Sequence, residues 1–199
     1  MPRPVNPTLK TDLLDAAIQL LESKGPAFSI RDLSSSIGYS TTAIYRCFSS
    51  RGDLLKAIQL RLFEELTTSL MPASMGGMEV SQAILDLGRG FVAWGVANPV
   101  RYEFMFHNAE PDALLEGPER ALAQAPLVLL ESLLTQGMST GELRPSDAKA
   151  AALMLFSGVH GLVSLYAAHR LDGFVDTDPV EMYAAWSATW MSQMRAELA

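Results

Sequence analysis

Hydroxyl, aromatic and guanidinium side chains cluster in one short stretch of the sequence. The stretch contains Ser40, Thr41, Thr42, Tyr45 and Arg46, and it begins two residues after a glycine. Side chains of these types suit phosphate oxygens, base edges and the thymine methyl group. If the stretch is helical, the unpaired amides of its first turn add positive potential toward a phosphate. The chemistry that these residues favour is therefore contact with a nucleic acid.

Two arginines flank this stretch, and the charge of the chain is unevenly distributed. We expect Arg31, near the start of the preceding helix, and Arg51, near the start of the following one, at the same surface. Residues 1–62 hold eight basic and five acidic residues, whereas the rest of the chain holds seven basic and seventeen acidic ones. The overall net charge of −7 argues against a protein that coats nucleic acid along its whole surface.

Two short helices joined by a tight turn must position these side chains. A capping-box pattern begins at Ser29, and Gly38 is suited to the end of the first helix. Ser40 can cap the second helix, whose Ile44 and Phe48 face the core. Helix pairs of this kind also occur in all-α proteins that bind no nucleic acid, so the spacing alone leaves both interpretations open.

Helical spacing of apolar residues recurs along the whole chain, and strand-like alternation persists nowhere. We therefore expect an all-α fold. With 199 residues, 49% of them hydrophobic, the chain can bury a substantial core. Beyond a break at 71–78 we expect helices over 79–98, 99–107, 118–137, 146–171 and 178–198, with Ser146 and Asp178 as N-caps.

Several other classes of function find little support. The chain has one cysteine and three histidines, and the nine-residue separation of His160 and His169 places them on opposite sides of a helix. We expect no metal site, no cofactor and no catalytic residues, because the usual enzyme signatures are also missing. No 18-residue apolar run and no signal-like N-terminus occur, so we expect a cytoplasmic protein without a membrane partner.

A longer pattern extends over the N-terminal third of the chain. It consists of Leu13–Ala17, Gly25, Ser29–Leu33, Gly38–Phe48 and Ser50–Leu55. In order and spacing, residues 8–68 resemble the DNA-binding domain of TetR-family transcriptional regulators, with the helix-turn-helix at 29–48. The resemblance implies that the DNA face comprises Arg31, Ser40, Thr41, Thr42, Tyr45, Arg46 and Arg51. Arg51 stands where the family usually has a phosphate-contacting lysine, which keeps the charge but changes the hydrogen-bond geometry.

The resemblance also implies a C-terminal domain, residues 79–199, that dimerises and binds a small-molecule effector. Apolar residues cover broad arcs of the last two expected helices, which then need partners on two sides. A four-helix interface between two copies satisfies this requirement, and a monomeric bundle core is the alternative. The expected dimerisation residues are Leu153, Val159, Leu162, Trp186, Trp190 and Met194.

Aromatic, methionine and histidine side chains around residues 91–107 and 154–160 resemble a TetR C-terminal subgroup named for Trp, His and Gly. These side chains either line an apolar pocket with few polar anchors or simply belong to the core. The expected effector-binding residues are Phe91, Trp94, Tyr102, Met105, Phe106, His107, Met154 and His160. His160 is the best candidate for a polar anchor, with a core histidine as the alternative.

From this resemblance we expect a ligand-responsive regulator that binds a double-stranded DNA operator as a homodimer. Repression, relieved by a small apolar effector, is the commonest mode in the family. The alternative is a helical small-molecule carrier or enzyme that kept the fold without DNA binding. A protein of that kind would not need Arg31, Tyr45, Arg46 and Arg51 around one short helix.

Overall fold

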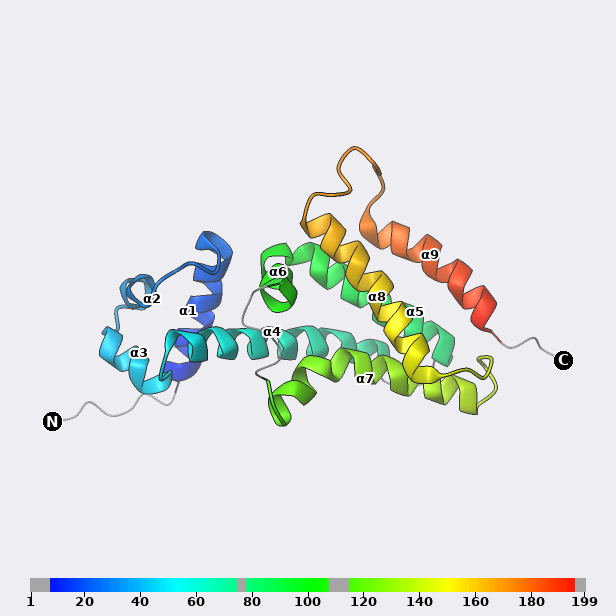
Figure 1. The fold of residues 1–199 in the computed structure, drawn as a ribbon, viewed down its shortest axis with the longest axis horizontal. Coiled ribbons are helices and arrows are strands. Elements are labelled where there is room, and N and C mark those ends of the chain that lie inside the picture. Colours follow the sequence, from blue (N-terminus) through cyan, green and yellow to red (C-terminus); the bar gives the residue numbers. More distant parts are fainter. Residues whose placement is uncertain (1–7, 75–77, 108–114, 196–199) are drawn as a thin grey trace. The chain divides into compact units, whose positions relative to one another are not determined.

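The computed structural model describes residues 8–74, 78–107 and 115–195. In these ranges the chain forms nine α-helices and no strand (Figure 1), which confirms the predicted all-α class. The helices are α1 (Leu9–Lys24), α2 (Ile30–Ile37), α3 (Thr41–Cys47), α4 (Arg51–Ser74), α5 (Val80–Ala97), α6 (Pro99–His107), α7 (Pro118–Ser139), α8 (Ala148–Ala167) and α9 (Pro179–Met194).

The chain divides into two compact units. The N-terminal unit comprises Met1–Phe63 and Val100–Leu115, and the C-terminal unit comprises Glu64–Pro99 and Glu116–Ala199. The division falls within α4. Helix α6 belongs to the N-terminal unit, whereas the expected domain boundaries at 8–68 and 79–199 assign it to the second domain.

Helix α6 joins the N-terminal unit through buried contacts with the first half of α4. The Gln59 side chain of α4 donates a hydrogen bond to the Met105 carbonyl at 2.9 Å. The Phe63 ring meets Phe106 edge to face, with the ring centroids 5.5 Å apart. Tyr102 is fully buried. These residues are far apart in the sequence, so helical periodicity alone does not reveal the contact.

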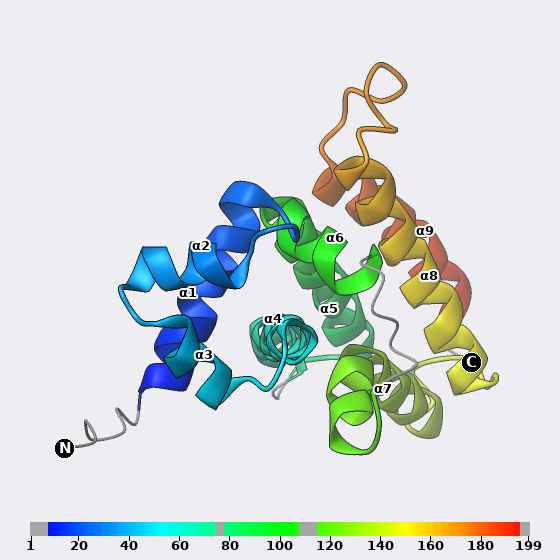
Figure 2. The same ribbon diagram turned by 60° about the vertical axis from the view of Figure 1, so that its left-hand side comes forward.

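The core of the N-terminal unit lies where α1, α2 and α3 meet (Figure 2). Leu13, Ala17 and Leu21 are fully buried at helical spacing on one side of α1, as are Leu33 of α2 and Ile44 of α3. Burying whole aliphatic side chains contributes about 1.5–3 kcal/mol each. This small apolar cluster therefore fixes which sides of α2 and α3 remain in water.

Local hydrogen bonds set the ends of these short helices as the sequence predicts. The Ser29 hydroxyl accepts from the Asp32 amide at 3.1 Å, and the Asp32 carboxylate accepts from the Ser29 amide at 2.8 Å. Gly38 ends α2 with φ 70° and ψ 18°, a left-handed conformation that favours glycine. The Ser40 hydroxyl then caps α3 by accepting from the Ala43 amide at 3.2 Å. The predicted capping box, C-terminal glycine and serine cap are confirmed.

In the C-terminal unit, α5 packs against α7, α8 and α9 (Figures 1 and 2). The close approach of α5 and α9 depends on Gly88, because a Cβ there would lie 2.2 Å from the Tyr183 hydroxyl. That hydroxyl donates to the Leu85 carbonyl at 3.0 Å. Burial disfavours the phenolate and raises the pKa of Tyr183 to about 12.

A distant carboxylate caps the start of α5. Glu142, in the loop between α7 and α8, accepts from the amides of Val80 at 2.9 Å and Ser81 at 2.7 Å. Partial burial opposes ionisation of Glu142, but hydrogen bonds from Ser81 and the Val80 amide outweigh it and lower the pKa. Arg195 adds a hydrogen bond to the Ser81 hydroxyl at 3.0 Å. The cap lies 61 residues or more along the chain from the amides that it serves.

The later helices differ from the expected boundaries in particular places. Helix α8 begins at Ala148 and is capped by the Asp147 carboxylate, which accepts from two amides, so Ser146 is not its N-cap. It ends at Ala167 rather than 171, because His169 adopts a left-handed conformation with φ 54°. Asp178 caps α9, as predicted.

Other expected boundaries fall partly outside the described ranges. Helix α4 continues to Ser74, past the expected break at 71. Parts of the expected breaks at 71–78 and 111–118, namely 75–77 and 111–114, lie outside the described residues. The expected last residues of the final helix, 196–198, lie outside them as well.

Candidate nucleic-acid interface and effector cavity

Helix α3 presents one face to the core and the opposite face to solvent. Ile44 is fully buried and Phe48, directly after the helix, is almost so. Thr42 and Arg46 are exposed, and Tyr45 is 50% exposed, an unusual condition for a large aromatic side chain. The core contacts of α3 therefore turn its predicted DNA-binding residues outward.

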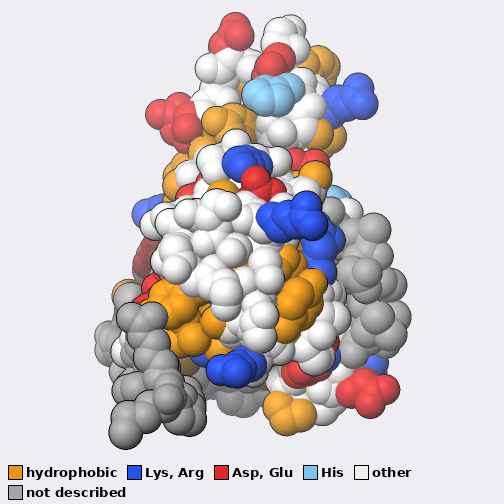
Figure 3. Space-filling model, turned by 90° about the vertical axis from the view of Figure 1, so that its left-hand side faces the viewer, with side chains coloured by type: hydrophobic (Ala, Val, Ile, Leu, Met, Phe, Trp, Pro, Cys, Tyr) orange, Lys and Arg blue, Asp and Glu red, His pale blue; other side chains and the backbone are white. Residues whose placement is uncertain are grey.

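The remaining residues of the predicted DNA face surround this helix. Ser40 is exposed at its N-terminal end, and Thr41 is half-buried. Arg31 is exposed in the first turn of α2. Figure 3 shows the side of the molecule that carries α1, α2 and α3: its centre is mostly backbone and side chains that are neither hydrophobic nor charged, with separate Lys and Arg patches, hydrophobic patches and some Asp and Glu around it. The surface offers hydroxyls and dispersed positive charges, which suit a phosphate backbone.

Arg51 makes a contact that the sequence does not predict. Its Nε and Nη2 atoms each lie 3.4 Å from the Phe28 carbonyl, and Nη2 also donates to the Pro26 carbonyl. Both carbonyls belong to the loop between α1 and α2. The guanidinium, itself exposed, therefore fixes the loop that leads into α2 in addition to placing a positive charge at the predicted interface.

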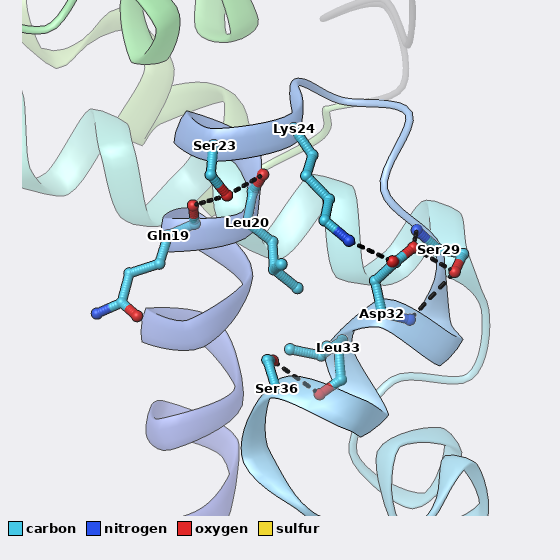
Figure 4. A network of polar contacts seen from close by, with 8 residues as sticks. All are labelled: Gln19, Leu20, Ser23, Lys24, Ser29, Asp32, Leu33 and Ser36. Carbon is cyan, nitrogen blue, oxygen red and sulfur yellow. Dashed lines mark hydrogen bonds and ion pairs between the residues drawn. The ribbon is translucent and has the colours of Figure 1, made fainter.

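A polar network holds the corner between α1 and α2 (Figure 4). Lys24, the last residue of α1, lies 2.5 Å from a carboxylate oxygen of Asp32 in α2. Hydrogen bonds from the Lys24 ammonium, and then from the Ser29 hydroxyl and amide, hold the pKa of Asp32 well below its usual value. The ion pair is partly exposed, so its main effect is to fix geometry.

The predicted effector-binding residues are divided between the two units, and their role in effector binding stays a prediction. In the C-terminal unit, Phe91 meets Phe156 edge to face with centroids 5.5 Å apart, and Phe156 stacks on His160 at 5.8 Å. Trp94, further along α5, is half-buried. Met154 of α8 is 69% exposed.

The other predicted effector-binding residues belong to the N-terminal unit. Tyr102 and Met105 are buried there, and Tyr102 packs on Phe106 with centroids 4.7 Å apart. His107 borders a cleft of about 280 Å³ together with Glu22 and Glu103. Their assignment to an effector site stays a prediction.

An apolar cavity lies within the C-terminal unit, between α5, α7, α8 and α9. Its volume is about 30 Å³. The lining includes Ile84, Phe91, Leu130, Phe156, Tyr183 and Trp186. Of the predicted effector-binding residues, only Phe91 is in this lining, and His160 lies one aromatic ring away from it. Two hydroxyls at the wall are already bonded to carbonyls, that of Tyr183 to Leu85 and that of Ser187 to Ala184.

The predicted dimerisation residues divide between the inside and the outside of the unit. On α8, Leu153 is 57% exposed, whereas Val159 is 6% exposed and lines the cavity. Val159 is buried within its own unit, as are Leu155 and Val163, and its place in a dimer interface stays a prediction. Trp186 of α9 is 40% exposed. Three further predicted residues are half-buried: Leu162, Trp190 and Met194.

Helix α8 carries more apolar surface than its own chain covers. By length and composition alone it could cross a membrane, with a mean hydropathy of 1.6 over an 18-residue window of which 22% is buried. Its exposed apolar side chains include Leu153, Met154 and Leu165. Several large apolar side chains exposed on one helix are consistent with a protein interface or a membrane-facing segment. Among the residues that the structure describes, no group of His, Cys, Asp or Glu side chains is arranged to hold a metal ion.

Comparison with known proteins identifies the family. A model described as bacterial regulatory proteins, tetR family, matches residues 13–58. A second model, described as the tetracyclin repressor-like C-terminal domain, matches residues 84–188, more than half of the chain. The chain belongs to the TetR family. The first match covers the helix-turn-helix built by α2 and α3, and the second covers most of the cavity lining, all of α8 and most of α9.

Relatives of this TetR-family chain include an uncharacterised HTH-type transcriptional regulator of Mycobacterium tuberculosis. The two are 29% identical over 146 residues, which is 68% of this chain and 60% of the relative. The match thus spans less than two thirds of the relative's length.

Solved structures show the same fold over nearly the whole chain. A protein of unknown function from Rhodococcus sp. RHA1 has a TM-score of 0.82 and 24% identity, with 98% of this chain and 100% of that chain covered. The fatty acid degradation regulator FadR from Bacillus halodurans has a TM-score of 0.76 and 16% identity, with 95% and 97% covered.

Two features of this TetR-family chain lie outside the predicted sites. Lys10 of α1 places its ammonium 5.6 Å from the centre of the Phe48 ring, next to the C-terminal end of α3. The predicted DNA face omits it, and only the excess of basic residues before position 62 hinted at it. Tyr183 and Ser187 form part of the cavity wall, although periodicity assigns the apolar side of α9 to a dimer interface.

Proposed function

We propose that this TetR-family chain is a sequence-specific DNA-binding transcriptional regulator that works as a homodimer in the bacterial cytoplasm. It represses transcription by occupying an operator and leaves the DNA when a small apolar effector binds. The observation that carries this proposal is the exposure of Thr42, Tyr45 and Arg46 on the side of α3 opposite its buried Ile44.

The DNA-binding part of the proposal follows from the composition of that exposed face. Tyr45 and Thr42 supply hydroxyls and apolar edges for base contacts, and Arg46 supplies a guanidinium. Arg31 and Lys10 add charges on either side, which attract the phosphate backbone and make binding salt-dependent. A helix as short as α3 reads only a half-site. Two copies are therefore needed, on half-sites about 34–36 Å apart or at a longer spacing.

The homodimer part is supported by the uncovered apolar surface of α8 and α9. Leu153 and Trp186 are large apolar side chains that stay substantially exposed in the single chain. Removing apolar surface from water favours association by about 25 cal/mol for each Å² buried, from which the cost of lost translational, rotational and side-chain freedom is subtracted. We propose that α8 and α9 of two copies pair in a four-helix interface that covers these side chains.

Selection of bound sequences from a random duplex pool tests the DNA-binding proposal. We expect a two-fold symmetric site, whose half-site spacing also reports the dimer. On that site, Tyr45→Ala and Arg46→Ala should each weaken binding about tenfold or more per half-site, because each removes a contact worth about 1–3 kcal/mol. Stability should change little, since both side chains are exposed.

The matched control is Arg170→Ala, which removes an exposed arginine from the C-terminal unit. It should leave operator affinity unchanged. A pool without enriched sequences, or a Tyr45→Ala variant that binds as tightly as the unaltered chain, would contradict the proposed interface.

A further inference from the structure

The apolar cavity of the C-terminal unit is too small for an effector in its present shape. Its volume is about 30 Å³, whereas a cavity of about 150 Å³ admits benzene. Protein interiors are close-packed, so a ligand can enter only if part of the wall moves. The side chain that is displaced can be inferred from how firmly each part of the wall is held.

Most of the wall is firmly held. Ile84 and Phe91 are almost fully buried in α5, and Leu130 is buried in α7. Tyr183 is buried as well, and its hydroxyl is bonded to the Leu85 carbonyl. Displacing any of these side chains would disturb the close packing of the core of the unit.

Trp186 is the exception. It lines the same cavity, yet it is 40% exposed, more than any other lining side chain. Its ring lies on Gly158 of α8, where an added Cβ would come within 2.9 Å of it. On the inner side it meets the Tyr183 ring with centroids 5.9 Å apart. The indole is thus a single layer between the cavity and the outer surface of α8 and α9.

The outer surface that Trp186 reaches is the proposed dimer face. Leu153, one of its expected members, is exposed on the same helix as Gly158. An indole pushed outward from the cavity would therefore enter space that a second copy occupies. This step rests on the proposed homodimer.

We infer that Trp186 is a gate that couples occupancy of the cavity to dimerisation. A small uncharged hydrocarbon or aromatic compound that enters the cavity displaces the indole outward and weakens the dimer. The ligand class follows from the wall: its lining is apolar, and its Tyr183 and Ser187 hydroxyls already have carbonyl partners. An ion would have to give up its hydration without a compensating charge.

Benzene is a suitable probe, measured with the full chain by sedimentation equilibrium. At saturating benzene we expect the dissociation constant of the dimer to rise about tenfold, within the range usual for coupled sites. By reciprocity the tenfold change is shared by the two cavities of the dimer, so dilute monomer should bind benzene about threefold more tightly per cavity than concentrated dimer. Calorimetry at the two protein concentrations checks this.

Two variants separate gating from a general loss of structure. Gly158→Ala should push the indole outward and weaken the dimer without benzene. In a Trp186→Ala background the same glycine substitution should have no further effect, because the side chain that it meets is gone. Trp186→Ala alone should bind benzene, and its dimerisation should be insensitive to it.

The measurements distinguish a failure of the Trp186 gate from a failure of the proposed homodimer. A chain that dimerises but binds no benzene, or that binds benzene with no change in dimerisation, would overturn the gate and leave the proposed regulator intact. A chain that stays monomeric at every concentration and on the selected operator would overturn the proposed homodimer, and the gate with it.

Discussion

Arg51 carries two roles that a single pair of substitutions can separate. Its guanidinium bonds to carbonyls of the loop before α2, through Nε and Nη2 to Phe28 and through Nη2 to Pro26. Its charge lies at the start of α4, where we expect a phosphate contact. Arg51→Lys keeps the charge and loses the planar pair of donors, whereas Arg51→Met loses both.

The expected cost to stability follows from these contacts. A net hydrogen bond contributes about 0.5–1.5 kcal/mol, and exposed carbonyls regain water when the arginine is removed. We therefore expect about 1 kcal/mol for the whole fork, in both variants. In a chain of this length that corresponds to a melting temperature about 2–4 °C lower. Calorimetry at one fixed protein concentration measures it, because dimerisation makes the melting temperature concentration-dependent.

The expected effect on DNA binding differs between the two variants. Each phosphate contact contributes about 0.9 to the slope of log affinity against log salt concentration. Arg51→Met should reduce the slope by about 0.9 per half-site, and Arg51→Lys should leave it nearly unchanged. Fluorescence anisotropy with the selected operator at several KCl concentrations gives the slopes.

The two roles of Arg51, in DNA binding and in stabilising the loop, can be refuted separately. An unchanged slope in Arg51→Met would show that the guanidinium touches no phosphate. An unchanged melting temperature in both variants would show that its bonds to the Pro26 and Phe28 carbonyls do not stabilise the loop.

Two further predictions concern the C-terminal unit. Gly88→Ala should destabilise the chain by about 1–3 kcal/mol despite the better helix propensity of alanine, because its Cβ meets the buried Tyr183 ring. The control Gly52→Ala should not destabilise the chain, because its Cβ has an ordinary neighbour at 3.6 Å. Equal melting temperatures of the two variants would contradict the packing of Gly88 against Tyr183. The pKa of Glu142 is lowered in the folded state, so its cap stabilises the fold fully at pH values above the ordinary pKa of 4.5. This stabilisation is lost as the pH falls through the folded-state pKa. Glu142→Gln should therefore flatten the loss of stability on acidification, and denaturation curves as steeply pH-dependent as those of the unaltered chain would count against the cap.

Features that depend on a few neighbouring residues can be predicted from the sequence. The capping box at Ser29, the left-handed Gly38 and the cap at Ser40 are examples, because each needs only hydrogen bonds within one helical turn. The burial of Ile44 follows equally from 3.6-residue periodicity. Ser146 shows the limit of such patterns: Asp147 also offers a good capping oxygen, and the path of the chain decides between them.

Only the tertiary structure decides which way a broadly apolar helix faces. Periodicity groups Leu153 with Val159, yet packing against α5 buries Val159 and leaves Leu153 outside. The same holds for aromatic residues that are close in sequence: Phe91 borders the cavity, whereas Tyr102 packs in the other unit. The sequence determined the helices and the exposed side of α3, because those depend on local spacing. The cavity, and the position of Trp186 between the cavity and solvent, depend on residues that are far apart in the chain, which local spacing does not encode.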